Sequence, residues 1–441
     1  MADPGTPDSG GPTSGIGVGR VRQNLIYRAG VLGRRPVVPT DPTELESRAR
    51  RAMSAQAWAY VAGGAGDGAT VRANRAAFDR WVIVPRMLRD VSRRDLSVEL
   101  YGRTLPAPVL VAPVGAPGLV ARDADVLIGR AAAALGVPYI FTNQGSVPME
   151  VTAAAMGDSP RWFQLYWSTD EQLVDSLIGR AEAMGADALV VTLDTTMLGW
   201  RPADLNLGSL PFARGIGLAQ YTSDPRFLEL VRERVTAASS GAKPSVEVTF
   251  GALRTLASTA RESPGGFIAN LRSPMPRAAV ETFLAIYSKP SLTWDDIATL
   301  RDRTRLPVLL KGILHPDDAR RALDLEIAGL IVSNHGGRQV DGSIAALDAL
   351  PAVAAAVEGR VPVVFDSGIR SGADVVKALA LGATAVAVGR PHIYGLALDG
   401  QAGVSAVLEN IIAELDLSLG LSGVASVAEL RERGSEIVRR A

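Results

Sequence analysis

Short apolar runs rich in β-branched residues alternate with longer, helix-like patterns from residue 105 onward. Most of the runs are separated by segments long enough for a helix, such as DADVLIGRAAAALG and DEQLVDSLIGRAEAMG. Buried parallel strands have continuous hydrophobic sequences, and eight of them, each followed by a helix, form a (β/α)8 TIM barrel. The pattern therefore predicts an α/β fold with a TIM barrel over residues 105–430. The eight runs cover residues 106–113, 138–142, 161–166, 187–194, 306–312, 329–336, 362–368 and 383–391.

Three segments depart from this alternation. Residues 1–20 are rich in Gly, Pro, Ser and Asp and are expected to form a flexible tail; the GIGVG within them lacks the preceding strand of a phosphate loop. Residues 21–104 are predicted to be an N-terminal helical extension that packs on the barrel, with one helix over ELESRARRAMSAQAWAYVAGG that ends at the glycine pair. Residues 201–292 contain Gly- and Pro-rich pieces and one or two helices. An insertion of this length after the fourth strand is typical of a lid over the barrel mouth.

Composition narrows the classes of function and location. Lys plus Arg equal Asp plus Glu at 46 each, and this zero net charge gives no reason to expect a nucleic-acid partner. The chain has no cysteine and three scattered histidines, so disulfides are excluded and no metal site is expected. No apolar run reaches the roughly 18 residues of a membrane span, and the N-terminus lacks a secretion-signal pattern. These features predict a cytoplasmic protein without membrane association.

Polar residues gather where the apolar runs end. In a TIM barrel the active residues lie at the C-terminal ends of the strands, and these ends share one face. The set found here is larger than ordinary loops explain, so it predicts a functional site at this face. It comprises Thr192, Asp194, Lys311, Ser333, Asn334, His335, Asp366, Gly389 and Arg390.

The segments FDSGIRSGAD (365–374) and VGRP (388–391), which follow the seventh and eighth strands, have the features of a phosphate site. Each supplies glycine and opens a helix whose first N–H groups can bind an anion. Arg370 and Arg390 add cationic side chains, and the same loops often bind phosphate in this fold. The alternative is a pair of ordinary turns with surface arginines.

The segment SNHGGRQVDG (333–342) places a histidine and an arginine three residues apart at a strand end. His335 can act as a general base near neutral pH, and Arg338 can bind a carboxylate through two hydrogen bonds. The pair suits a substrate that carries an ionised acid beside a hydroxyl group, whereas a lone histidine more often has a packing role. Asp194 can orient this histidine or cap a helix. Lys311 can stabilise negative charge on an electron-accepting ring or extend to the surface.

These motifs resemble the FMN-dependent 2-hydroxy acid oxidase and dehydrogenase family, which includes glycolate oxidase and lactate oxidase. The resemblance extends from about residue 25 to 430. Within the family, LGWRPADLNLGSLPFARG (198–215), YTSDP and KGILHPDDARRA are most similar to the lactate 2-monooxygenases. The resemblance implies bound FMN and a homo-oligomer, either a tetramer or an octamer. The other similar segments are FQLY, TLDT, LPVLLKG, SNHGGRQ, FDSGIRSGADVVKALALGA, VGRP, AYVAGGAGDGATVRANRAAFDRW and PRMLRDVSRRDLSVELYG.

The resemblance also implies roles for individual residues. His335 matches the catalytic base, with Asp194 as its partner, and Lys311 matches the lysine beside the pyrimidine end of the flavin. Tyr166 resembles a catalytic tyrosine that hydrogen-bonds the substrate. The residues implied to hold the substrate carboxylate are Tyr60, Arg201 and Arg338. The residues implied to bind FMN, including its ribityl phosphate, are Pro113, Val114, Gly115, Thr142, Gln164, Thr192, Lys311, Ser333, Asp366, Ser367, Gly368, Ile369, Arg370, Gly389 and Arg390.

The implied reaction is the oxidation of a small L-2-hydroxy acid, with L-lactate as the expected substrate and O2 as the oxidant. The expected outcome is that of a lactate 2-monooxygenase, which gives acetate, CO2 and water because the 2-oxo acid stays bound. The first alternative is an oxidase that releases the 2-oxo acid and H2O2, and the insertion is expected to decide between the two. The others are a dehydrogenase with another electron acceptor and, from a different class, an FMN-barrel isomerase or a non-catalytic phosphate-binding barrel. Departures from the family pattern at TNQGS (142–146) and at residues 228–290 leave the exact substrate open.

Overall fold

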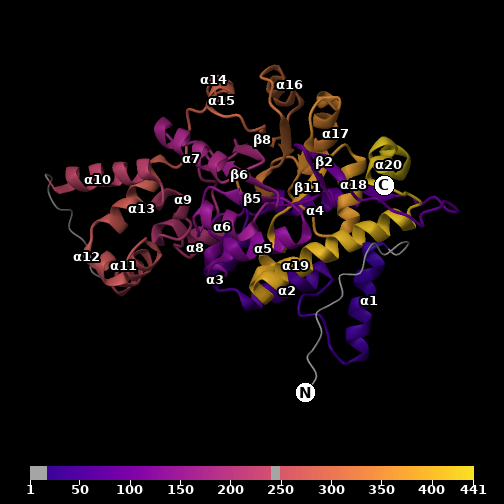
Figure 1. The fold of residues 1–441 in the computed structure, drawn as a ribbon, viewed down its shortest axis with the longest axis horizontal. Helices are drawn as coiled ribbons and strands as arrows, with labels where there is room; N and C mark the ends of the chain where they lie inside the picture. The colour runs from indigo at the N-terminus through magenta and orange to yellow at the C-terminus, as the bar shows by residue number, and fades with distance from the viewer. Residues whose placement is uncertain (1–16, 240–248) are drawn as a thin grey trace.

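The eight predicted runs form eight parallel strands that close into a barrel in the computed structural model of the protein, which describes residues 17–239 and 249–441 (Figure 1). Each strand pairs with the next one along the chain, and the last pairs with the first. The predicted TIM barrel is therefore confirmed. The strands are β4 (Val109–Val111), β5 (Tyr139–Thr142), β6 (Arg161–Leu165), β7 (Ala188–Thr192), β8 (Val308–Ile313), β9 (Gly329–Val332), β10 (Val363–Phe365) and β11 (Ala385–Val388).

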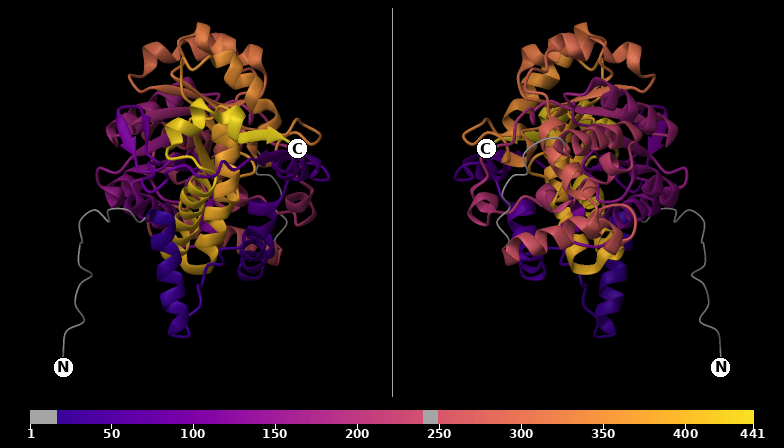
Figure 2. Two further views of the ribbon diagram at one scale, coloured as in Figure 1. Left: turned by 90° about the vertical axis from the view of Figure 1, so that its right-hand side faces the viewer. Right: turned by 90° about the vertical axis from the view of Figure 1, so that its left-hand side faces the viewer.

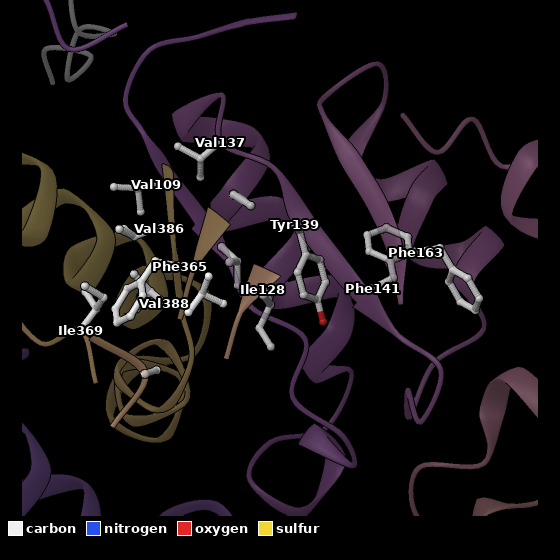
Figure 3. Packing of buried hydrophobic residues seen from close by; sticks show 14 of the residues in the cluster. Val109, Ile128, Val137, Tyr139, Phe141, Phe163, Phe365, Ile369, Val386 and Val388 are labelled. Carbon is white, nitrogen blue, oxygen red and sulfur yellow. The ribbon is translucent and has the colours of Figure 1, made fainter. Parts of the chain in front are cut away.

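Successive residues of each strand face opposite sides of the barrel wall, as the period of two requires. Val109, Val111 and Phe365 belong to the core between strands and surrounding helices, part of which Figure 3 shows. The residues between them, Leu110 and Val364, belong to a second core inside the barrel. Both faces of every strand are buried, so the strands read as continuous apolar runs in the sequence.

Helices surround the barrel and connect its strands (Figures 1 and 2). The longest, α19 (Arg390–Leu421), follows the last strand and changes direction at Asp399 and Gly400. Within the described residues, no helix is long and apolar enough to cross a membrane. The other connecting helices are α5 (Ala124–Leu135), α6 (Met149–Met156), α7 (Glu171–Ala183), α14 (Trp294–Ala298), α15 (Leu300–Arg303), α16 (Pro316–Asp324), α17 (Ala346–Val357) and α18 (Gly372–Ala380).

The N-terminal region differs from its prediction in two places. The helix α1 (Val18–Val31) begins inside the expected tail, and the remainder of that tail, residues 1–16, lies outside the described residues. The single helix expected before the glycine pair is two helices, α2 (Pro42–Ala52) and α3 (Ala55–Ala62). The break occurs because the Ser54 side chain accepts a hydrogen bond from Ala57 N–H at 3.1 Å and starts a new helix.

Further N-terminal elements fix the region to the barrel. The hairpin of β2 (Val98–Leu100) and β3 (Arg103–Leu105) closes the end of the barrel opposite the functional site, because its apolar side chains belong to the inner core. The strand β1 (Trp81–Ile83) pairs with the C-terminal strand β12 (Val438–Arg440). The remaining elements are α4 (Ala69–Asp79), α20 (Val427–Glu432), α21 (Gly434–Ile437) and two short 3-10 helices, η1 (Pro117–Leu119) after β4 and η3 (His335–Gly337) after β9.

The insertion after β7 is more helical than predicted. Its helices α10 to α13 lie together at one side of the barrel, beside α7 (Figure 1). Apolar residues such as Phe227 and Phe283 are fully buried among these helices, which is why they form an ordered unit instead of a loop. The elements are α8 (Pro202–Asn206), η2 (Pro211–Arg214), α9 (Ala219–Thr222), α10 (Pro225–Ser239), α11 (Phe250–Glu262), α12 (Phe267–Arg272) and α13 (Met275–Ile286).

Candidate active site

The floor of the candidate site consists of eight inward-facing residues, each located near the C-terminal end of a barrel strand or directly after it. Each of these residues follows an apolar residue of the inner core by two positions, so the period of the strand aims it into the barrel mouth. The inner core is apolar below this layer, and the layer itself is polar except for Ala112 and Gly389. The residues are Ala112, Thr142, Gln164, Thr192, Lys311, Ser333, Asp366 and Gly389.

Hydrogen bonds connect neighbouring members of this polar floor. Gln164 donates from Nε2 to Thr192 Oγ1 at 3.0 Å. Lys311 donates from Nζ to Ser333 Oγ at 2.8 Å and lies 3.1 Å from Asp366 Oδ2. Burial by itself would lower the pKa of Lys311, but the charges of Asp366 and Asp194 raise that pKa above its ordinary value. The barrel mouth therefore contains a permanent buried cation.

Above the floor, a cavity with about 950 Å³ of empty space, its mouth included, brings most of the predicted site residues together. The remaining predicted residues, Asp194 and the floor residues Thr142, Gln164, Thr192 and Ser333, do not line it directly. The predicted residues that line it are Tyr60, Pro113, Val114, Gly115, Tyr166, Arg201, Lys311, His335, Arg338, Asp366, Ser367, Gly368, Ile369, Arg370, Gly389 and Arg390.

Several lining residues were not predicted. Phe212 and Tyr287 come from opposite ends of the insertion, 75 residues apart in the chain, and Leu198 comes from the segment just before it. Gln144 and Thr195 come from loops after β5 and β7. The unusual TNQGS segment was a signal for Gln144, whereas nothing local in the sequence indicates which insertion residues return to the barrel mouth.

His335 follows β9, lies in the wall of the cavity and pairs with a carboxylate that follows β7, two strands away in the barrel. Its Nδ1 is 2.7 Å from Asp194 Oδ1, and Thr195 Oγ1 donates to the same oxygen at 2.9 Å. The His335 backbone has φ of 56°, in the left-handed region, and its N–H donates to Ser333 Oγ at 3.0 Å. Because Nδ1–H faces Asp194, the other ring nitrogen, Nε2, is left to accept a proton.

Electrostatics favours a neutral imidazole beside an ionised carboxylate. Burial lowers the pKa of His335 below its ordinary value, and the charge of Asp194 only partly offsets this. Burial by itself would raise the pKa of Asp194, but the neighbouring His335 and the charge of Lys311 hold it at about 2. A neutral imidazole with an oriented lone pair is the form that a general base requires.

The lowered pKa of His335 leads to a prediction about pH dependence. A base with a lowered pKa keeps its lone pair at lower pH, so kcat/KM is expected to fall only below about pH 6.5, the ordinary value for histidine. The Asp194→Asn variant removes the charge that raises this pKa, so its acid limb should lie at still lower pH and its kcat should fall by about two to four orders of magnitude. Profiles of kcat/KM against pH for both proteins test this. An acid limb that moves to higher pH in the variant would contradict the assignment.

The arginines of the cavity are held by neutral acceptors. Arg338 Nη1 donates to the carbonyl oxygens of Tyr60 and Gly63, and its guanidinium lies 5.0 Å from the Tyr60 ring centroid. Arg201 Nε donates to the Arg338 carbonyl at 3.1 Å. Arg390 donates to the carbonyls of Val61 and Gly63, both at 3.0 Å. In residues 17–239 and 249–441, no carboxylate forms an ion pair with any of these three arginines, so their charge is available to an anion.

Burial lowers the pKa values of Arg338 and Arg390 without discharging them at neutral pH. Burial, together with the charge of Arg201, lowers the pKa of Arg338 to about 9. Burial, assisted by the charge of Arg370, lowers the pKa of Arg390 to about 10. Desolvation is the larger cause of these depressed pKa values and repulsion between neighbouring arginines the smaller one, and an anionic ligand would offset both.

One part of the predicted phosphate site is wrong. The amides at the start of α18 were expected to face an anion, but those of Arg370 and Ser371, just before the helix, and of Gly372, its first residue, already have partners. Asp374 Oδ2 accepts from Arg370 N–H at 2.8 Å and from Ser371 N–H at 3.2 Å, and Glu414 accepts from Gly372 N–H at 2.8 Å. The corner of the cavity that could bind an anion is therefore defined by the side chains of Arg370 and Arg390 and by the loop between β10 and α18, which line it.

The other histidines have structural positions away from the cavity. His315 caps α16, where its Nδ1 accepts from Asp317 N–H at 3.2 Å. His392 is buried in α19, with Nδ1 2.7 Å from the Val388 carbonyl, and burial lowers its pKa to about 4. The described residues contain no group of three or more His, Cys, Asp or Glu that could hold a metal ion.

Comparison with known proteins agrees with this geometry. The family model of FMN-dependent dehydrogenases matches residues 49–437. An FMN-dependent alpha-hydroxy acid dehydrogenase, qulF, from Penicillium citrinum is 43% identical over 408 residues, which cover 92% of this chain and 93% of the relative. An L-lactate oxidase from Lysinibacillus sphaericus is 41% identical over 388 residues, 88% of this chain and 90% of the relative. A crystal structure of mandelate oxidase matches with a TM-score of 0.70 at 34% identity, covering 89% of this chain and 97% of that one.

These relatives correct the expectation about the subgroup of the family to which the chain is most similar. They are a dehydrogenase and oxidases, whereas the sequence segments had indicated the greatest similarity to lactate 2-monooxygenases. The predicted similarity to that subgroup has no support among them.

Proposed function

The chain belongs to the FMN-dependent alpha-hydroxy acid dehydrogenase and oxidase family and is an FMN-dependent L-2-hydroxy acid oxidoreductase. Within this family, we propose that it works as an oxidase. It converts a small L-2-hydroxy acid, such as L-lactate, and O2 into the 2-oxo acid and H2O2. The observation that carries the proposal is the His335–Asp194 pair facing a cavity that also contains Arg201 and Arg338. A base and a carboxylate site in one cavity fit a 2-hydroxy acid and have no evident use in an isomerase.

The cavity residues fit FMN. A Cβ at Gly115 would lie 2.7 Å from Gln144 Oε1 and 2.9 Å from Tyr60 OH, so a side chain at this lining position would crowd two other residues of the cavity, and glycine leaves that space open for a ligand. Arg370 and Arg390 would hold the phosphate, and the Lys311 ammonium would lie beside the ring. When bound, FMN supplies the two-electron acceptor and the reactivity toward O2.

The residues of the chain position the substrate and move its proton. Arg201, Arg338 and Tyr60 would hold the carboxylate, which would bring the hydroxyl group on the 2-carbon to His335. The neutral His335 accepts the hydroxyl proton at Nε2, and Asp194 stabilises the resulting imidazolium. Burial raises the pKa of Tyr166 well above its ordinary value, so its hydroxyl stays protonated and can donate a hydrogen bond to the substrate oxygen.

A second outcome, release of acetate, CO2 and water as in a lactate 2-monooxygenase, is favoured by the insertion. Phe212 and Tyr287 line the cavity, and their ring centroids lie 5.1 Å and 5.0 Å from that of Phe283 in the core of the insertion. Phe212 also contacts Tyr60 edge-on at 6.3 Å. A packed wall of this kind retards departure of the 2-oxo acid, which is the condition for its decarboxylation.

Product analysis distinguishes these outcomes. The FMN-loaded protein is supplied with L-lactate in air, and pyruvate, acetate, CO2 and H2O2 are quantified. We expect one pyruvate and one H2O2 for each O2 consumed. Acetate and CO2 without free H2O2 would establish the monooxygenase outcome instead. Oxidation of L-lactate only with an artificial acceptor would indicate a dehydrogenase, and failure of every 2-hydroxy acid to reduce the bound FMN would refute the proposal.

A further inference from the structure

The side chain of Gln339, outside the proposed catalytic set, connects Arg201 to the backbone of Asp194, the residue that pairs with His335. Gln339 Oε1 accepts a hydrogen bond from Arg201 Nη2 at 2.6 Å. Its Nε2 donates to the carbonyl oxygens of Asp194 at 2.7 Å and Met197 at 2.9 Å. The amide therefore joins the first residues after β7, which include the partner of His335, to an arginine seven positions further along the chain.

The surrounding backbone is closely packed, so this arrangement has little freedom. A Cβ at Gly199 would lie 2.6 Å from the Arg338 carbonyl oxygen and 2.8 Å from that of Gln339. Gly66 N–H donates to the Trp200 carbonyl at 2.9 Å. The segment that leads to Arg201 thus lies directly on the loop that carries His335 and Arg338.

Of the side chains that could stand at position 339, an uncharged amide can both accept from Arg201 and donate to the two carbonyl oxygens. Two carbonyl oxygens need a donor, and the Arg201 guanidinium needs an acceptor. A glutamate would accept from Arg201 but would face the two carbonyls without a proton to donate, and it would neutralise the charge that the substrate needs. A lysine would donate to the carbonyls but would repel Arg201.

We propose that Gln339 is a positioning residue that orients Arg201 for the substrate carboxylate while leaving its positive charge unpaired. This inference rests on the proposed function, in which Arg201 binds that carboxylate. It adds a requirement on chemistry: the acceptor that orients the arginine must be neutral. Gln339 itself does not line the cavity and acts only through Arg201.

Two substitutions separate charge from hydrogen bonding. Gln339→Glu adds a negative charge beside Arg201, and Gln339→Met removes the hydrogen bonds without adding charge. Val340→Glu is the matched control, because this neighbouring side chain is exposed and places the same charge in solvent. All are studied as FMN-loaded protein, with the Kd of pyruvate and of uncharged pyruvamide measured from the flavin absorbance and with steady-state kinetics on L-lactate.

We expect Gln339→Glu to raise the Kd of pyruvate and the KM of L-lactate by about 10- to 100-fold, with a much smaller change in kcat. Gln339→Met should raise both by about 3- to 10-fold. Val340→Glu should change them by no more than about twofold, because exposed charges are screened. Binding of pyruvamide and the affinity for FMN should stay near the values of the unmodified protein in all three.

Other results would overturn the inference. Unchanged pyruvate binding in Gln339→Glu would contradict the requirement for a neutral acceptor. Equal weakening of pyruvate binding in Gln339→Met and Gln339→Glu would show that the added charge has no effect of its own. Equal loss of FMN affinity and pyruvamide binding would show a purely structural role. If the unmodified protein neither binds pyruvate nor oxidises a 2-hydroxy acid, the proposed function fails and this inference fails with it, whereas normal turnover with insensitive variants contradicts Gln339 alone.

Discussion

Replacement of His335 by asparagine is expected to lower the rate of substrate oxidation by about two to four orders of magnitude, the usual contribution of a positioned general base. Asparagine removes the basic nitrogen but tolerates the left-handed backbone that His335 adopts at φ of 56°. The loop and the FMN affinity should therefore be preserved. The rate is measured by stopped-flow spectroscopy as the bleaching of bound FMN at saturating L-lactate without oxygen.

The same substitution at His315 provides the control. His315 is exposed and caps α16, a position at which asparagine is also a good capping residue. His315→Asn should oxidise L-lactate at the normal rate. Retention of more than about a tenth of the normal rate in His335→Asn would show that another group removes the proton, since a general base contributes far more than this.

Replacement of Arg338 by lysine is expected to raise the KM for L-lactate and the Kd for pyruvate by about 100-fold or more. The guanidinium donates to two backbone carbonyls of the N-terminal region and still has N–H groups for a carboxylate, and a lysine cannot provide this fork. A 100-fold change corresponds to about 2.8 kcal/mol, since each tenfold change in affinity is about 1.4 kcal/mol. Isothermal titration with pyruvate measures this effect separately from catalysis.

Arg390→Lys is the matched comparison, because Arg390 has the same kind of carbonyl partners but lies in the phosphate corner. It should weaken FMN binding and leave the Kd of pyruvate for the loaded protein nearly unchanged. The opposite result, in which Arg390→Lys weakens pyruvate binding and Arg338→Lys weakens FMN binding, would show that Arg390 binds the substrate carboxylate and Arg338 the phosphate.

The barrel and its polar floor could be predicted from the sequence because both depend on local pattern. Buried parallel strands require continuous apolar runs, and a polar residue at the end of such a run can only lie at the barrel mouth. Lys311, Asp366 and His335 were found in this way. The same reasoning failed for the start of α18, because Asp374 and the distant Glu414 satisfy its amides and no local pattern reveals the second of these partners.

The sequence by itself determined the class of fold, the face that carries the site and, through family motifs, the chemistry expected there. Only the tertiary structure decided how the arginines are held. The carbonyls that orient Arg338 and Arg390 belong to α3 and its C-terminal end, more than 270 residues earlier in the chain. Gln339 meets Arg201 across 138 residues. Carbonyl groups are identical in every residue, so the sequence cannot show which of them becomes an acceptor until the chain has folded.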